Sequence, residues 1–250
     1  MRIGMFDSGV GGLTVLKEFL SIMPNNEYIY FGDTKRIPYG NKSKEAILSF
    51  SREIVEFLLQ KEVDIIVVAC NTVSATCLSE LQKEYSIPLI GVVEPTIEYI
   101  KKNNYQSLGL IGTIATINSK IYPNNLSDIK IIDKPCPLLV PAIEENLCEN
   151  ELMDDILDLY LSPYKNTNIQ GLILACTHYP IIENKIKKYL DTTIINPASI
   201  TAEYVFSKYE NKASSKKIEL YFSDVNDTTL AVGTNILGFD IKEYINLAGE

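Results

Sequence analysis

Two cysteines follow two apolar segments that lie far apart in the chain. Cys70 comes after residues 65–69 and Cys176 after residues 172–175, and small polar residues follow each cysteine before a helical pattern begins. Apolar runs of this kind are typical of buried parallel strands, and ligands of open α/β sheets bind beyond the carboxyl ends of such strands. Because a helix N-terminus lowers the pKa of a thiol from about 8.5, we expect two acid/base groups or nucleophiles. One such cysteine would ordinarily be a core residue, but two in matched contexts favour chemistry.

His178 is the one histidine in the chain, and it follows Cys176 by two residues. Its unperturbed pKa of about 6.5 suits proton transfer near neutral pH. We therefore expect His178 to act with the neighbouring thiol, and Glu144 is a candidate to orient its imidazole. The pair Glu144–Glu145 also has a simpler interpretation, because acids near a helix start are stabilised by the helix dipole.

A glycine-rich segment, residues 7–12, joins the first expected strand to a helical pattern. Three glycines let the backbone turn tightly, and the N–H groups of the following helix favour an anion. The glycine spacing matches neither a P-loop nor a dinucleotide-binding fingerprint. We predict an anion-binding loop in which Asp7 orients a neighbour or accepts a proton; helix capping by Asp7 or Ser8 is the alternative.

A second loop is expected at residues 32–40, which are rich in turn formers. Loops at the carboxyl ends of strands often carry function. Tyr39 and Gly40, which follow a proline, are therefore candidates for a rigid wall and a backbone donor that face a small ligand. An ordinary surface turn is the alternative.

Short apolar runs alternate with amphipathic stretches along the whole chain. Strands are expected at residues 3–6, 28–31, 65–69, 89–92, 108–111, 129–132, 172–175, 193–195 and 218–222. Helices are expected at residues 13–20, 43–59, 74–85, 96–102, 151–161, 181–190, 200–209 and 228–237. This order predicts an α/β fold with mostly parallel sheets that are flanked by helices. Because the two cysteine segments echo each other, we expect two similar lobes that face one ligand across a cleft.

Composition narrows the class of protein. With 250 residues, of which 46% are hydrophobic and 22% charged, the chain is typical of globular proteins. A net charge of −9 argues against a nucleic-acid partner. No apolar stretch approaches the roughly 20 residues of a membrane-spanning helix, so no membrane role is expected. Met1 leads almost directly into the first expected strand and leaves no room for a secretory signal, which predicts a cytoplasmic protein.

The five cysteines are expected to be free thiols in a reducing compartment. Cys77, Cys136 and Cys148 lack a matched context, and we interpret them as structural. The chain has no C-x-x-C motif and a single histidine, so no metal site is expected.

Taken together, five motifs closely resemble those of the bacterial glutamate racemase family. They appear in the family's order over nearly the whole chain, and they are FDSGVGGLTV at 6–15, GDT at 32–34 continuing to PYG at 38–40, ACNT at 69–72, GVVEP at 91–95 and ACTHYP at 175–180. Val73 and Ala175 depart from the commonest pattern, but both are small apolar changes that bear on packing more than on chemistry.

The resemblance implies an amino-acid racemase that needs no cofactor and consists of two α/β lobes related by a pseudo-twofold axis. The first lobe would comprise residues 1–93 plus 207–250, with Asp7 and Cys70, and the second would comprise residues 94–206, with Cys176 and His178. The active site would lie in the cleft between them. The family's product, D-glutamate, is a building block of peptidoglycan, so a role in cell-wall synthesis and cell shape is implied, along with a homodimer.

The resemblance also assigns roles to the motif residues. Cys70 and Cys176 would exchange a proton with opposite faces of the substrate α-carbon. Asp7 would assist Cys70, while His178, supported by Glu144, would assist Cys176. The substrate, glutamate, would be bound by polar residues of both lobes: Asp7, Ser8, Tyr39, Gly40, Asn71, Thr72, Thr113, Thr116, Thr177 and His178.

Three other functions remain open from the sequence. Aspartate and hydantoin racemases and maleate isomerases share two-cysteine chemistry within the same superfamily. A cysteine hydrolase would use Cys176 as nucleophile with His178 and would leave Cys70 unexplained. A phosphate-ligand binding module built on the glycine-rich loop would explain neither cysteine.

Overall fold

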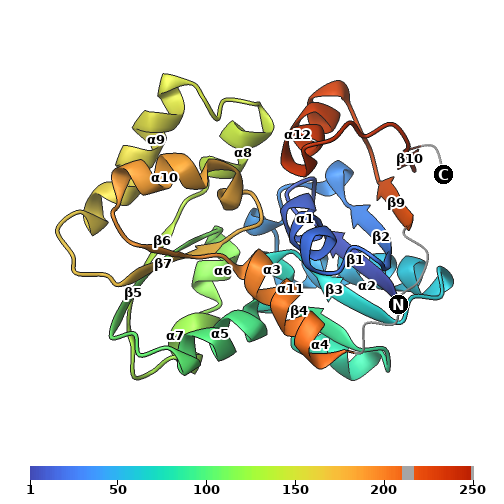
Figure 1. Cartoon of the computed structure of the whole chain (residues 1–250), viewed down its shortest axis with the longest axis horizontal. Coiled ribbons are helices and arrows are strands. Elements are labelled where there is room, and N and C mark those ends of the chain that lie inside the picture. Colours follow the sequence, from blue (N-terminus) through green and yellow to red (C-terminus); the bar gives the residue numbers. More distant parts are fainter. Residues whose placement is uncertain (210–216, 249–250) are drawn as a thin grey trace.

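The fold is built on two parallel β-sheets, seen in a computed structural model that describes residues 1–209 and 217–248 (Figure 1). The first sheet has the strand order β10-β9-β2-β1-β3-β4, and the second has the order β6-β5-β7-β8. The first sheet contains β1 (Arg2–Asp7), β2 (Glu27–Gly32), β3 (Ile65–Val68), β4 (Leu89–Gly91), β9 (Lys217–Phe222) and β10 (Ile245–Asn246). The second contains β5 (Ser107–Gly112), β6 (Lys130–Pro135), β7 (Gly171–Ala175) and β8 (Thr193–Ile195).

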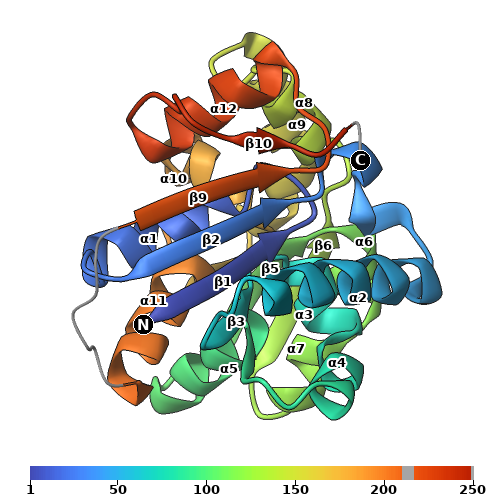
Figure 2. The same ribbon diagram turned by 90° about the vertical axis from the view of Figure 1, so that its right-hand side faces the viewer.

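Helices connect the strands and cover both faces of each sheet, as a parallel sheet requires (Figures 1 and 2). Those associated with the first sheet are α1 (Leu13–Ile22), α2 (Lys44–Gln60), α3 (Asn71–Thr76), α4 (Leu78–Glu84), α11 (Pro197–Lys208) and α12 (Asp227–Leu237). Those associated with the second are α5 (Val93–Lys102), α6 (Ile114–Asn118), α7 (Ile121–Asn125), α8 (Leu139–Glu144), α9 (Glu151–Leu161) and α10 (Glu183–Tyr189). Four single-turn 3₁₀ helices complete the connections: η1 (Thr34–Arg36), η2 (Tyr39–Asn41), η3 (Ser162–Tyr164) and η4 (Tyr179–Ile182). No helix in the described ranges is long and apolar enough to span a membrane.

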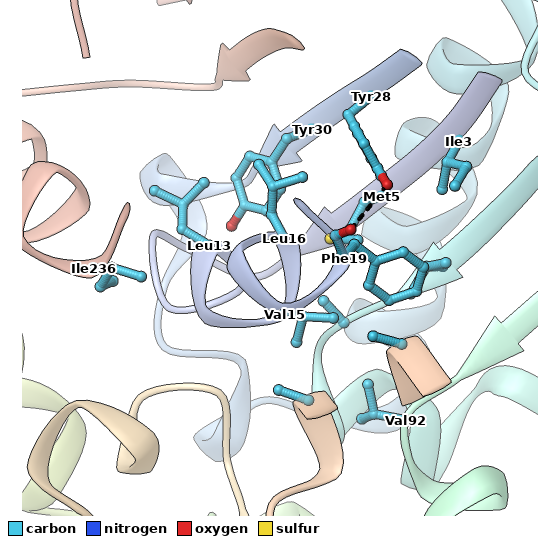
Figure 3. Close-up of a cluster of buried hydrophobic side chains, with 14 of the residues drawn as sticks. Ile3, Met5, Leu13, Val15, Leu16, Phe19, Tyr28, Tyr30, Val92 and Ile236 are labelled. Atoms are coloured by element: carbon cyan, nitrogen blue, oxygen red, sulfur yellow. Dashed lines mark hydrogen bonds between the residues drawn. The ribbon is translucent and has the colours of Figure 1, made fainter. Parts of the chain in front are cut away.

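The core of the first sheet lies in two apolar layers, because successive side chains of a strand point to opposite faces. Met5 of β1 packs in the layer beneath α1, whereas the adjacent Phe6 packs in the layer beneath α2. Figure 3 shows the α1 layer, where Phe19 meets Tyr28 edge to face at a centroid distance of 6.4 Å. The Tyr28 hydroxyl also donates to the carbonyl of Phe19 (3.2 Å), which ties α1 to β2.

The two sheets repeat one topology. The first sheet contains the run β2-β1-β3-β4, and the second sheet is β6-β5-β7-β8. If the four strands of each run are numbered along the chain, both runs have the spatial order 2-1-3-4. Cys70 follows β3 and Cys176 follows β7, so the two cysteines occupy matched places, and Ser8 and Thr113 follow the matched strands β1 and β5. The expected α/β class with two similar lobes is confirmed.

Helix α11 joins the two halves, because it packs against both α1 and α5. Its buried residues Ala198, Ala202 and Val205 belong to the same apolar layer as α1. The division expected between residues 206 and 207 falls inside this helix, so the division of the chain into two units at that point stays a prediction.

Most expected elements form, and the differences are local. The helix expected at residues 74–85 is two helices, α3 and α4, which meet at Cys77, whose φ of −129° is not helical. The short helices α6, α7 and α8 were not expected, because five or six residues are too few to show a helical period. Residues 210–216 and 249–250 lie outside the described ranges.

Candidate active site

Cys70 lies at the junction of β3 and α3, where it occupies the N-cap position of the helix. Its Sγ is 3.6 Å from the Ser8 hydroxyl, which belongs to the adjacent strand end. Burial raises the pKa of Cys70 to about 12, and the negative charge of Asp7 adds to the rise, whereas the Val73 N–H and Ser8 oppose it. The expected lowering by the helix N-terminus is therefore present but outweighed, because the thiol is removed from water.

Cys176 lies beside His178, and a chain of contacts connects the two to Glu144. The Cys176 Sγ is 3.9 Å from His178 Nδ1, and His178 Nε2 is 2.9 Å from Glu144 Oε1. Burial alone would lower the pKa of His178, but its hydrogen bonds to Cys176 and Glu144 and their charges raise that pKa well above its usual value. The imidazole of His178 thus lies between a thiol and a carboxylate and, when protonated, can donate to both.

Glu144 is the last residue of α8 and not near a helix start. The helix dipole disfavours a carboxylate at this end, so the simpler interpretation of the Glu144–Glu145 pair does not hold. The contact with His178 provides the compensating positive charge. Likewise, Cys176 is not followed directly by an α-helix: residues 177–178 lead into the single turn η4, which contains Pro180 and precedes α10.

The glycine loop, residues 8–12, binds an anion that belongs to the protein itself. The N–H groups of Gly9 and Gly12 donate to Asp7 Oδ2 at 3.1 and 3.0 Å. Burial raises the pKa of Asp7, while the positive charge of His178 and these N–H groups oppose the rise. Two donors of the expected anion-binding loop are thus taken by the end of its own strand, and the binding of an external anion stays a prediction.

The glycine loop also touches the other half of the molecule. A Cβ added at Gly11 would lie 2.4 Å from His178 Nδ1 and 2.7 Å from Thr177 Oγ1, so a glycine is required for this close approach. The Thr177 hydroxyl lies 3.4 and 3.5 Å from the two carboxylate oxygens of Asp7. Asp7 therefore sits behind the Cys176 turn, which we define as residues 176–178.

Tyr39 and Gly40 are positioned by the segment that follows β2. The Tyr39 hydroxyl donates to the fully buried carboxylate of Asp33, which also accepts from Arg36 Nε at 2.6 Å. Since the hydroxyl proton of Tyr39 is committed to Asp33, its ring and backbone are what remain for a ligand. A Cβ at Gly40 would lie 2.7 Å from Thr113 Cβ, so Gly40 allows η2 to pack closely against α6 of the other half.

A cavity lies between the two halves of the molecule, and both thiols belong to its wall. The wall consists of Ser8, Ile37, Pro38, Tyr39, Gly40, Cys70, Asn71, Thr72, Thr113, Val140, Glu144, Cys176, Thr177 and His178. A larger hollow, bordered by residues such as Thr34, Asn226 and Thr229, shares Ile37 and Glu144 with it. We place the active site in the smaller cavity, because that is where the proton-transfer groups converge.

The cavity gathers most of the expected site residues. Asp7 and Thr116 are not part of its wall: Asp7 lies behind Thr177, and Thr116 contacts the wall through a 3.0 Å hydrogen bond between its hydroxyl and that of Thr113. The Thr113 hydroxyl is also 2.9 Å from that of Thr72, which joins the two halves. The side-chain oxygen Oδ1 of Asn71 is buried and has no hydrogen-bond partner within the described residues, so it is available to a ligand donor.

Sequence reasoning missed three apolar residues of the cavity wall: Ile37, Pro38 and Val140. Ile37 and Pro38 lie in the loop that was expected to be functional, so only their contribution was missed. Val140 lies four residues before Glu144 in α8, and this spacing places both on one face of a helix that the sequence did not predict. Residues 1–209 and 217–248 contain no group of three His, Cys, Asp or Glu side chains that could hold a metal ion.

Comparison with known proteins agrees with this chemistry. The family model for Asp/Glu/Hydantoin racemase matches residues 14–205. The chain is 40% identical to the glutamate racemase of Hydrogenobaculum sp. over 99% of this chain and 97% of that protein, and 42% identical to that of Aquifex pyrophilus over 96% and 95%.

Solved structures give the same relation. The glutamate racemase of Francisella tularensis in complex with D-glutamate superimposes with a TM-score of 0.90 at 37% identity, covering 98% of this chain and 96% of that one. An isoform from Bacillus anthracis gives a TM-score of 0.91 at 35% identity, covering 100% and 98%. The chain therefore belongs to the Asp/Glu/Hydantoin racemase family, within which these full-length relatives are glutamate racemases.

Proposed function

We propose that this protein interconverts L- and D-glutamate by proton transfer at the α-carbon between two thiols, with no bound cofactor. The observation that carries the proposal is that Cys70 and Cys176, from matched positions of two similar sheets, line one cavity. Inversion of a stereocentre requires one group to remove the α-proton while another delivers a proton to the opposite face. Two thiols that reach one cavity from different halves of the molecule can meet this requirement.

The two thiols would have different helpers. His178, held by Glu144, lies beside Cys176, and the thiolate of Cys176 would remove the α-proton of one enantiomer. Cys70 holds its proton, as its pKa of about 12 favours, and would deliver it to the other face. In the opposite direction, Cys176 would begin with the proton, and Cys70 would remove the α-proton. We assign Asp7 to the Cys70 side, because its negative charge acts on the thiol of Cys70. Its carboxylate also accepts from the hydroxyl of Thr177, which belongs to the other half.

The polar groups of the cavity suit an amino acid. The unpaired Oδ1 of Asn71 can accept from the α-ammonium group, and the hydroxyl of Ser8 can donate to a carboxylate. The hydroxyls of Thr72 and Thr177 would donate to a carboxylate by turning away from Thr113 and Asp7. Thr113 would contact the substrate directly. Thr116 would contribute indirectly, because its hydroxyl holds that of Thr113 in place. A site closed to water strengthens these hydrogen bonds as negative charge develops at the α-carbon.

The decisive experiment is incorporation of solvent deuterium at the α-position. We expect the protein in D₂O to exchange the α-proton of both L- and D-glutamate, followed by NMR, with aspartate and alanine as controls. Faster exchange of aspartate than of glutamate would make the protein an aspartate racemase. An absence of exchange with all three amino acids would exclude an amino-acid racemase.

The alternatives fit less well. Hydantoin racemases and maleate isomerases share the chemistry but not the glutamate-like motif set, and a cysteine hydrolase built on Cys176 and His178 gives no role to Cys70. A phosphate-binding module needs free N–H groups in the glycine loop, but those of Gly9 and Gly12 already bind Asp7.

We further propose that the protein supplies D-glutamate for peptidoglycan and acts in the cytoplasm as a homodimer. The five cysteines are all free, which fits a reducing compartment, and the proposed reaction needs Cys70 and Cys176 reduced. Light scattering after gel filtration tests the dimer, and rescue of a D-glutamate auxotroph tests the supply of D-glutamate.

A further inference from the structure

The glycine loop and the first turn of α1 hold the Cys176 turn from the opposite half of the molecule. The backbone of Gly11 lies against the imidazole of His178, and the carboxylate of Asp7 lies near the Thr177 hydroxyl. A third contact comes from Thr14, the second residue of α1, whose hydroxyl is 2.9 Å from the carbonyl oxygen of Thr177. The reaction proposed above gives Thr14 no role.

The geometry shows where the hydroxyl proton of Thr14 is needed. Thr14 Oγ1 is also 2.9 Å from the carbonyl oxygen of Gly11, but that oxygen already accepts the N–H of Thr14 at 3.0 Å. For the Thr177 carbonyl, the Thr14 hydroxyl is the donor within reach among the described residues. A hydroxyl has one proton to donate, and it contributes most where no other donor serves the acceptor.

The Thr177 carbonyl is part of the peptide group that leads into His178. Fixing the direction of this carbonyl fixes the plane of that peptide group, and with it the direction in which the His178 side chain leaves the backbone. The imidazole must reach Cys176 on one side and Glu144 on the other, at 3.9 and 2.9 Å. A small rotation of the peptide group would lengthen both contacts together.

We propose that Thr14 is a positioning residue for the Cys176 half of the reaction, acting through the Thr177 carbonyl on His178. Thr14 contacts neither thiol, and it lies on a helix of the half that carries Cys70. The half that carries Cys70 therefore orients part of the proton-transfer group of the other half.

The test compares three variants. Thr14→Val removes the hydroxyl at nearly constant volume, and Thr14→Ser retains it. Thr201→Val is the matched control, because Thr201 is also fully buried and donates to its own helix, at 2.6 Å to Pro197, without touching the Cys176 turn. All three should retain the fold, which thermal unfolding checks.

The first measurement, which rests on the proposed function, is the α-deuterium isotope effect on kcat/KM in both directions. We expect Thr14→Val to lower kcat about five- to tenfold, the effect of losing one hydrogen bond in the transition state. The isotope effect should rise in the direction in which Cys176 removes the proton and fall in the other, because transfer at Cys176 becomes the slower step. Thr14→Ser should restore the wild-type values, and Thr201→Val should keep them.

The second measurement needs no substrate. Alkylation by iodoacetamide is followed at Cys70 and Cys176 by peptide mass spectrometry across a pH series. We expect the midpoint at Cys176 to rise by roughly half to one pH unit in Thr14→Val, while that at Cys70 stays unchanged. The charged and titratable groups around Cys176 and His178 are the same in all variants: Asp7, Cys70, Cys136, Glu144, Cys148 and Tyr179.

Equal changes in the isotope effect in both directions, or equal shifts at both thiols, would show that Thr14 is merely structural. Values in Thr14→Val that match those of Thr201→Val would overturn the proposal as well. If wild-type protein fails to racemise glutamate, the proposed function fails, but the alkylation series still decides the role of Thr14.

Discussion

At the scale of single residues, the two thiols occupy matched places but have unlike surroundings. Cys176 has a histidine two positions later, whereas the corresponding position after Cys70 is Thr72, whose hydroxyl contacts Thr113. Burial, and after it the negative charge of Asp7, raises the pKa of Cys70, whereas the group beside Cys176 is an imidazole held by Glu144. The two thiols are therefore not equivalent, although their places in the two sheets match.

We expect Cys70→Ala and Cys176→Ala each to abolish racemisation, because each thiol serves one face of the α-carbon. Both should remain folded, at a cost of about 1–2 kcal/mol for removing a small buried group. Circular dichroism of the glutamate product and thermal unfolding measure the two effects. Cys77→Ala removes an equally buried thiol outside the cavity and should retain activity. Near-normal turnover in either site variant would refute a two-thiol reaction.

The contact between His178 and Glu144 predicts how stability depends on pH. The folded pKa of His178 lies above its usual value of 6.5, so both folded and unfolded chains hold the proton below that pH and the contact contributes fully. As the pH rises, the unfolded chain loses the proton first, and the free energy of unfolding falls until the pH passes the folded pKa. Burial raises the pKa of Cys70 from 9.0 to about 12, which adds a second fall above pH 9.0.

Denaturant titrations at a series of pH values should therefore show that the wild-type protein loses stability from near neutral to alkaline pH. Glu144→Gln should flatten the first part of this dependence, and Cys70→Ala should flatten the second. A wild-type slope in Glu144→Gln would contradict our assignment of the histidine proton.

At the scale of elements, the glycine loop has two structural tasks. Its N–H groups donate hydrogen bonds to the buried carboxylate of Asp7 at the end of β1. Its Gly11, which has no side chain, lets the Cys176 turn approach the loop backbone closely. Both tasks depend on the loop following directly from the strand into α1.

Gly11→Ala tests the second task. Its Cβ would lie 2.4 Å from His178 Nδ1, so the imidazole or the whole loop must shift. A displacement of about 1 Å at a proton-transfer group can cost on the order of 100-fold in rate, and we expect a loss of kcat of that size. Gly4→Ala is the control, because its Cβ meets side-chain atoms of Val63 at 3.2 Å, in β1 but away from the cavity. If Gly11→Ala lost no more rate than Gly4→Ala, the close contact would have no catalytic importance.

The elements that the sequence predicts are those that a local pattern specifies. The strand before each cysteine is a continuous apolar run, and the position of the thiol follows from parallel topology, so Cys70, Cys176 and the loop around Tyr39 could be assigned in advance. Helix α8 could not, because its six residues include Pro141 and show no helical period. For the same reason the position of Glu144 at a helix end was not foreseen.

The contacts between the halves have no local signal at all. The approach of Gly11 to His178 and the hydrogen bond from Thr14 to Thr177 join segments that lie more than 160 positions apart. They depend on how the two sheets pack, which neither periodicity nor turn chemistry specifies. The glycines of the loop were recognised, but the surface they serve could be identified only in the folded molecule.

At the scale of the whole molecule, one small cavity depends on both halves. Residues 70–72 come from one half and the Cys176 turn from the other, while Gly40 and Thr113 close the contact between them. A ligand that fills the cavity must therefore touch both halves of the molecule.

We expect glutamate to protect both thiols together from alkylation. Peptide mass spectrometry should show that saturating D- or L-glutamate slows labelling at Cys70 and Cys176 to a similar extent, while Cys148, which is half-buried outside the cavity, is labelled as before. Protection of one thiol alone would place the ligand in one half only and would contradict a shared site.

The near-complete burial of the two thiols, of which 4% and 6% is exposed, affects more than acidity. If the thiols act as proposed, each conversion moves one proton off a sulfur and another onto its counterpart, so the protein that releases one enantiomer is a different tautomer from the protein that bound the other. Water must carry a proton back before the same conversion can occur again. The free enzyme thus keeps the protonation pattern that its last conversion left, and the access of water to the buried thiols sets how long this pattern lasts. At high substrate concentration, the net rate would be limited by this return of the proton through water and not by proton transfer at the α-carbon.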